Sequence, residues 1–177
     1  MTDTAHNGGV RMIRHTTGRL RGDNELAVAR TLRGTADDVW QSFTDPTRLS
    51  RWYGTYTGDC ADGRVTVVMT AEEGHEGTPF HIVRCERPHV LEARAEEAGI
   101  EWRLTLEVTE HDGISTLTLV QAFDRPDEVG SVGPGWEYYL DRLVAAETGN
   151  DVEAISWDEY YPVQQAYYTQ LATQMRF

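Results

Sequence analysis

Alternation between hydrophobic and polar residues dominates the middle of the chain. Over residues 100–108 every second residue is apolar, and those between are charged residues or threonine. One wet face and one dry face are typical of an antiparallel sheet. Turn-forming pairs separate such runs, and Asp112-Gly113 is the strongest hairpin signal among them. We therefore expect strands near 55–60, 64–71, 78–87, 89–96, 100–110 and 114–124.

A hairpin and two short helices are predicted ahead of these strands. The segment 16–34 reads as a hairpin that turns at Gly22, Asp23 and Asn24. Thr35 is a suitable N-cap for a helix whose apolar residues share one face. The pair Asp45-Pro46 ends this helix and begins a second one, since the residue before proline avoids the α region.

A long helix is predicted near the end of the chain. Four apolar residues at positions i, i+3, i+4 and i+7 form one amphipathic face, and Gly149 marks the end. The preceding segment, GSVGPG at 130–135, is interpreted as a flexible entry to the helix and a candidate gate. A further helix is expected from near Pro162. We divide the chain into a flexible segment 1–15, a domain 16–149 and a helical extension 150–177 packed on that domain.

Charge excludes several classes of function. The net charge is −13, which argues against a nucleic-acid groove and against an anionic membrane surface. All 16 basic residues are arginine, so no lysine can form a Schiff base or complete a Walker A loop. No apolar run approaches the roughly 20 residues that cross a bilayer, and the N-terminus lacks a secretory hydrophobic run. We expect a cytoplasmic protein.

Metal and cofactor sites are not indicated. Cys60 and Cys85 are far apart in the sequence without CxxC spacing, and we expect two free thiols. His81 and Cys85 are four residues apart on a predicted strand, roughly 13 Å, too far to share one metal ion. HExxH and GxSxG motifs are absent from the sequence. We predict no metal, no cofactor and no catalytic residue.

Three stretches carry a resemblance to a known family. They are VWQSFTDPTRLSRWYG at 39–54, CERPHVLEA at 85–93 and GWEYYLDRL at 135–143. They resemble the SRPBCC superfamily, which includes START domains and birch-pollen allergens, in its branch named for the activator of the heat-shock-protein-90 ATPase. The resemblance covers about residues 24–147. It implies an α+β helix-grip fold: a curved antiparallel sheet of about seven strands around a long C-terminal helix, with two short helices after the first strand.

The resemblance also implies a cavity between sheet and helix, and strand parity selects the residues that we expect to face it. On 78–87 we assign the face of His81 and Val83, with Cys85, to the inside, opposite Phe80 and Ile82. The alternative for each candidate is plain packing in a solid core. The predicted ligand-binding residues are Trp52, His81, Val83, Trp102, Leu104, Gln121, Trp136, Tyr139, Leu140 and Leu143.

Binding of a hydrophobic or amphipathic small molecule is the expected function. The same cavity leaves open an aromatase/cyclase-like or hydrolase-like enzyme, in which His81, Tyr139 or Gln121 would position a carbonyl and move a proton. The family branch leaves open a co-chaperone-like interaction domain. The expected partner is a small-molecule ligand; nucleic acid and membrane insertion are not expected, and a homodimer is left open.

Overall fold

Eight antiparallel strands form one sheet in the part of the chain that the computed structural model describes, residues 14–70, 77–97 and 99–177. The sheet order is β1-β2-β8-β7-β6-β5-β4-β3, so β2 and β8 are neighbours although they are distant in sequence. The resemblance implied about seven strands, and the predicted hairpin together with the six strands after it accounts for all eight. The strands are β1 (Arg19–Arg21), β2 (Glu25–Arg33), β3 (Gly54–Asp59), β4 (Arg64–Met69), β5 (Thr78–Glu86), β6 (Val90–Glu97), β7 (Ile100–His111) and β8 (Ile114–Ala122).

Four α-helices accompany the sheet in the described residues: α1 (Ala36–Thr44), α2 (Pro46–Leu49), α3 (Val129–Thr148) and α4 (Gln165–Ala172). The two predicted caps are present. The Thr35 side chain accepts a hydrogen bond from the backbone N–H of Asp38, and the Asp45 side chain accepts one from Arg48. Short 3-10 turns lie at Cys60–Asp62, Pro126–Glu128, Val152–Ala154 and Trp157–Glu159. The α+β helix-grip architecture predicted from the sequence is confirmed.

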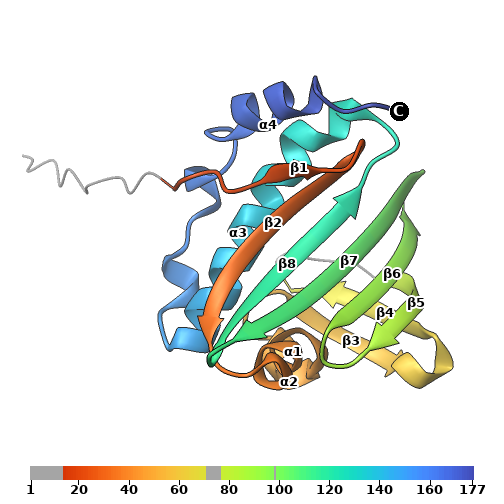
Figure 1. Ribbon diagram of the computed structural model, residues 1–177, viewed down its shortest axis with the longest axis vertical. Coiled ribbons are helices and arrows are strands. Elements are labelled where there is room, and N and C mark those ends of the chain that lie inside the picture. The colour runs from red at the N-terminus through yellow and green to blue at the C-terminus, as the bar shows by residue number, and fades with distance from the viewer. Residues whose placement is uncertain (1–13, 71–76, 98) are drawn as a thin grey trace, which may run out of the picture.

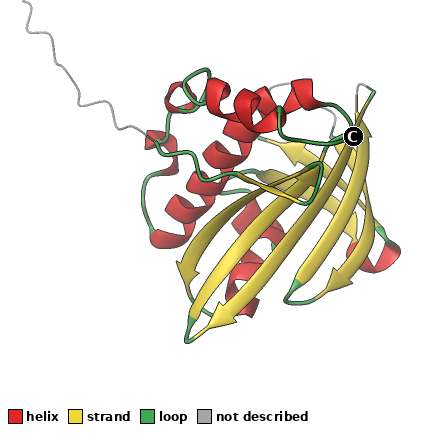
Figure 2. Ribbon diagram, turned by 45° about the horizontal axis from the view of Figure 1, so that its top comes forward, coloured by secondary structure: helices red, strands yellow, loops and turns green. Residues whose placement is uncertain are grey.

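Helix α3 lies across one face of the sheet (Figure 1). In this view α4 lies at the top of the molecule, and α1 and α2 lie at the bottom. The second view shows the helices gathered on the same side of the curved strands (Figure 2). Val28 and Leu117 of the sheet and Leu140 and Leu143 of α3 are completely buried. This part of the interface between helix and sheet is therefore a solid core.

Residues 130–135 form the first turns of α3, so the prediction of a flexible entry and gate is wrong. Gly130 and Gly133 serve close packing against α4. A Cβ atom on Gly133 would lie 2.2 Å from Cδ1 of Tyr168, and one on Gly130 would lie 2.6 Å from Oγ1 of Thr169. Only glycine lets the two helices approach so closely. Local sequence suggested a loop because the partner of these glycines lies far along the chain.

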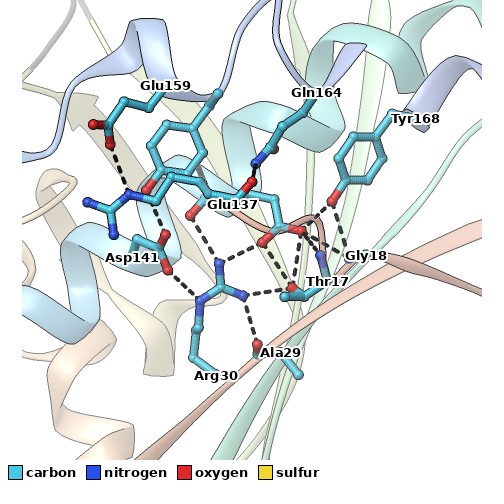
Figure 3. A network of polar contacts seen from close by, with 11 residues as sticks. Thr17, Gly18, Ala29, Arg30, Glu137, Asp141, Glu159, Gln164 and Tyr168 are labelled. Carbon is cyan, nitrogen blue, oxygen red and sulfur yellow. Dashed lines mark hydrogen bonds and ion pairs between the residues drawn. The ribbon is translucent and has the colours of Figure 1, made fainter. Parts of the chain in front are cut away.

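A buried carboxylate joins both ends of the described chain to α3 (Figure 3). The Glu137 side chain is fully buried and accepts hydrogen bonds from the backbone N–H groups of Thr17 and Gly18. It also accepts from the hydroxyls of Thr17 and Tyr168, and it pairs with Arg30 at 2.6 Å. Five donors of this kind compensate the loss of water around a buried charge.

The tyrosines of the C-terminal extension complete this network. Burial, followed by the charge of Glu137, raises the pKa of Tyr168 above its ordinary value. Burial and a 2.6 Å hydrogen bond to Asp141 likewise raise the pKa of Tyr160. Both hydroxyls therefore stay protonated and act as donors. Helix α4 begins at Gln165, three residues later than the predicted start near Pro162.

Candidate functional site

Two adjoining cavities lie on the helix side of the sheet. The one called the inner cavity lies between the sheet and the α1–α2 region, with Trp136 of α3 at its edge, and the one called the outer cavity lies between the sheet and α3. The inner cavity has a volume of about 120 Å³ and the outer cavity about 260 Å³. Pockets for drug-sized ligands measure about 300–1,000 Å³. Each cavity alone is smaller than that, and together they reach the lower end of this range. The side chains that line both cavities are Tyr53, Val67, Phe80, Leu104 and Trp136.

The inner cavity is lined almost entirely by apolar surface. Two of its aromatic residues bond their polar atoms to backbone carbonyls. The indole Nε1 of Trp52 donates to the Ser42 carbonyl at 2.9 Å, and the Tyr56 hydroxyl donates to the Thr44 carbonyl at 2.6 Å. Burial raises the pKa of Tyr56, which keeps that hydroxyl protonated. The inner cavity therefore suits an uncharged, hydrophobic group.

The outer cavity combines aromatic rings with one carboxylate. Tyr53, Trp102, Trp136 and Tyr139 line it together with Glu97. The ring of Tyr53 stacks on Trp136 with centroids 6.5 Å apart, and it meets Tyr139 edge to face at 4.8 Å. Since Tyr53 and Trp136 also line the inner cavity, this stacked pair lies at the boundary between the two spaces.

Helix α3 supplies one wall of the outer cavity. Ser131, Gly135, Trp136 and Tyr139 face the cavity, on a different side of the helix from the glycines that contact α4. A Cβ atom on Gly135 would meet nothing within 4 Å. This glycine therefore leaves open space beside the aromatic rings.

Gln121 positions the indole of Trp136. The amide lies on β8 with 1% of its surface exposed, and its Oε1 accepts from Trp136 Nε1 at 2.6 Å. The partner that a buried amide requires is thus a protein side chain. Gln121 is not among the residues that line either cavity.

The structure places five predicted site residues in the cavity walls. Trp52 lines the inner cavity, Trp102 and Tyr139 line the outer one, and Leu104 and Trp136 line both. Their contact with a ligand stays a prediction. Three other predicted residues lie in the closed core instead, with at most 1% of their surface exposed: Gln121, Leu140 and Leu143.

The inward assignment of His81 and Val83 is wrong. Both are exposed, Val83 at 52%, while Phe80 and Ile82 line the inner cavity. Apolar residues occur on both faces of this strand, so alternation did not identify the inner one. The pairing of β5 with β6 also shifts between Ile82 and Arg84, as at a β-bulge, so simple parity does not extend beyond Val83.

The cavity walls include residues that sequence reasoning did not select. Phe43 and Tyr53 come from the two short helices and the turn after them, and Tyr56 and Val67 come from β3 and β4. Phe43 shares the apolar helical face with Trp40, a signal that could have identified it. Strands β3 and β4 alternate weakly, so their inner faces carried no comparable signal. The other missed residues are Thr44, Leu49, Val65, Met69, Thr78, Glu97, Ser131, Val132 and Gly135.

The two cysteines, distant in sequence, meet beside the inner cavity. Cys60 lines that cavity, and Cys85 lies near enough to affect its thiol. Burial, and then the neighbouring Cys85, raise the pKa of the Cys60 thiol. Both cysteines are free thiols. Within the described residues, no cluster of three or more His, Cys, Asp or Glu side chains could hold a metal ion.

Known structures share this fold. CalU16 from Micromonospora echinospora matches with a TM-score of 0.67 and 24% identity over 84% of this chain and 88% of that one. A protein from Arthrobacter aurescens matches with a TM-score of 0.61 and 15% identity over 75% and 91%. DynU16, a protein in the dynemicin biosynthetic locus, matches with a TM-score of 0.57 and 22% identity over 73% and 49%.

Sequence comparison identifies the family. No curated protein sequence matches the chain.

In the described part, no helix has both the length and the apolar character needed to span a membrane. The family model described as "Activator of Hsp90 ATPase homolog 1-like protein" matches residues 33–147. This match covers more than half of the sequence, and the chain therefore belongs to that family.

Proposed function

We propose that this protein binds a hydrophobic or amphipathic small molecule in the two adjoining cavities between the sheet and helices α1–α3. The observation that carries the proposal is the inner cavity, a space of about 120 Å³ with an almost wholly apolar wall. Well-packed protein interiors hold few voids larger than a water molecule. Apolar pockets with a few polar groups are the usual form of small-molecule sites.

One protein of similar fold is named for a biosynthetic locus. DynU16, whose fold is similar, is described as a protein in the dynemicin biosynthetic locus. At 22% identity this likeness concerns the fold, and function is argued from the site. The two spaces between sheet and helix are the features of this site that suit a ligand.

Catalysis in the same cavity ranks below binding. Of the three groups that the enzyme hypothesis invoked, His81 lies on the outer face and Gln121 is engaged by Trp136. Tyr139 alone lines the outer cavity. A general acid or base must lie within hydrogen-bonding reach of the reacting group, which His81 cannot do from the outer face.

A fluorescence titration with the neutral probe N-phenyl-1-naphthylamine tests the proposal. Ala93 lines the inner cavity, and Ala93→Leu adds three carbon atoms to that wall. Ala122→Leu is the matched control, because Ala122 lies on the outer face of the sheet. We expect saturable binding by the wild-type protein and by Ala122→Leu, and a loss of about fivefold or more in Ala93→Leu.

Two results would contradict the proposal. One is the absence of saturable probe binding to the folded wild-type protein. The other is equal probe affinity in wild-type protein and Ala93→Leu, which would place the probe outside the inner cavity. Native mass spectrometry of the purified protein adds a direct search for a retained ligand.

A further inference from the structure

We propose that Arg142 of α3 is a positioning residue for the ligand cavity: it holds the backbone of Trp52 in the cavity wall and ties it to the segment after α3. This inference rests on the proposed function and goes beyond it, since it assigns control of ligand affinity to a residue that lines neither cavity. It is carried by the hydrogen bonds of one buried guanidinium group.

The Arg142 side chain bonds to the cavity wall and to the C-terminal extension at once. Its Nε donates to the Trp52 carbonyl at 3.1 Å. Its terminal nitrogens reach the segment after α3, where Nη1 donates to the Val152 carbonyl at 3.3 Å and Nη2 pairs with Glu153 at 3.2 Å. Nη1 also donates to the Tyr138 hydroxyl at 3.2 Å. Because the guanidinium is planar and its N–H groups have fixed directions, a shift of one acceptor disturbs the bonds to the others.

The turn that Arg142 holds carries aromatic residues of both cavities. Trp52 lines the inner cavity and lies between α2 and β3. Its ring is held by the bond from Nε1 to the Ser42 carbonyl, and its backbone by the bond from Arg142. The next residue, Tyr53, lines both cavities and stacks on Trp136. A displacement of this turn would therefore move rings in both cavity walls.

A buried arginine is an expensive means of packing α3 against this turn. Arg142 has 8% of its surface exposed, whereas its acidic partner among the described residues, Glu153, has a side chain that is 83% exposed. The other acceptors are neutral oxygens, and the Tyr138 ring lies 5.3 Å from the Arg142 Cζ. Burial of a cation costs more free energy than burial of an apolar side chain of similar volume. Directional bonding, which an apolar side chain cannot supply, is what the guanidinium adds here.

Arg142 thereby connects the cavity to residues beyond the family match. Arg142 and Trp52 lie within the matched residues 33–147, whereas Val152 and Glu153 lie after them. No residue after position 149 is found among the described residues that line either cavity. The extension thus contributes to the shape of the cavity through Arg142 rather than by direct contact.

Two variants of Arg142 and one matched control test the inference in the full-length protein. Arg142→Lys keeps the positive charge and loses the planar group, and Arg142→Met keeps an unbranched chain without donors. Tyr160→Phe is the control, because it removes the 2.6 Å bond from the extension to Asp141, the residue before Arg142 on α3. Tyr160 lines neither cavity. All proteins are measured at a temperature at which each is folded, so that lower stability alone leaves the Kd unchanged.

Affinity for N-phenyl-1-naphthylamine and hydrogen exchange are the readouts. We expect both Arg142 variants to bind the probe about fivefold or more weakly than wild type, and Tyr160→Phe to stay within about twofold. The backbone amides of Trp52 and Tyr53, which both donate to the Leu49 carbonyl, should exchange faster in the Arg142 variants and not in the control. If Arg142→Met does not fold, Arg142→Lys decides alone.

Three results would overturn the inference while the binding proposal stands. One is equal probe affinity in Arg142→Lys and wild type. Another is an equal loss of affinity in Tyr160→Phe, which would indicate a general effect of a loosened extension. The third is weaker binding without faster exchange at Trp52 and Tyr53, because the wall would not have moved. If folded wild-type protein fails to bind the probe, the proposed function is refuted and this inference falls with it.

Discussion

The indole of Trp136 donates a 2.6 Å hydrogen bond to the amide oxygen of Gln121, joining α3 to β8 beneath the cavities. Both side chains are buried, with 7% and 1% of their surface exposed. Trp136 also lines both cavities and stacks with Tyr53. A single polar contact therefore fixes a ring that lines both cavities.

A double-mutant cycle should reveal this contact. Gln121→Leu leaves the indole N–H without its acceptor, and Trp136→Phe leaves the amide oxygen without its donor. Each should lower the free energy of unfolding by about 1–3 kcal/mol, because an unpaired buried polar group retains its desolvation cost. The double variant should be less destabilised than the sum of the singles by about 1 kcal/mol. Urea denaturation measures all three, and strict additivity would show that the bond contributes nothing specific.

Two glycines two residues apart in α3 should respond in opposite directions to alanine. Gly133→Ala would place Cβ 2.2 Å from the Tyr168 ring and should destabilise the protein by about 1–3 kcal/mol through overpacking. Gly135→Ala has open space around it and should stabilise by up to about 1 kcal/mol through helix propensity. Thermal and urea melts of both variants provide the comparison. Similar shifts in both would mean that α4 does not pack as closely as described.

These glycines also show what sequence patterns could not predict. The caps at Thr35 and Asp45 and the alternation over residues 100–108 depend on neighbouring residues, and they predicted two helices and the inner face of β7. Gly133 depends on Tyr168, which no local pattern connects to it. The glycine-rich segment was therefore taken for a loop, although α4 requires Gly130 and Gly133.

Loss of the Glu137 charge should release both ends of the described chain. Glu137→Gln removes the buried pair with Arg30 and places an amide donor among existing donors. We expect a loss of about 3–5 kcal/mol in unfolding free energy, as when one partner of a buried ion pair is removed. Hydrogen exchange should increase at the Gly18 amide and in α4. Glu153→Gln is the control, since the Glu153 side chain is 83% exposed beside Arg142 and should matter little.

Two results would contradict the prediction for Glu137→Gln. If Glu137→Gln matched the stability of Glu153→Gln, the donors around residue 137 would be compensated by water. Unchanged protection of the Gly18 amide would lead to the same conclusion, because that N–H bonds directly to the carboxylate.

The Cys60 thiol should react with alkylating reagents only at elevated pH. Its pKa is raised by burial and by Cys85, and the thiolate is the reactive form. In the Cys85→Ser variant, the iodoacetamide rate at Cys60 should have its pH midpoint above that of the same variant unfolded in urea. Alkylation reactions quenched at several times and pH values, and read by mass spectrometry, measure this midpoint. A midpoint at or below the unfolded value would show that Cys60 lies in a more polar setting.

The residues of the candidate site were predictable only where the local sequence pattern identifies the inner face of a strand or helix. Leu104 and Trp102 were placed correctly in the cavity walls because β7 alternates without interruption. Strand β5 carries apolar residues on both faces, and its register shift lies between Ile82 and Arg84, so His81 and Val83 were assigned to the wrong side. Leu140 shares the helical face of Trp136 yet meets packed side chains, because the cavities occupy only part of the interface.

The segment that matches the family model is shorter than the segment needed to satisfy the buried charge of Glu137. Glu137 lies inside the matched residues 33–147, whereas the described groups that donate to its carboxylate, from Thr17, Gly18, Arg30 and Tyr168, all lie outside them. A chain shortened to the matched segment would keep a buried charge and discard those donors. Residues outside the family match thus satisfy a buried charge inside it. A fragment intended for expression or grafting should include both flanks.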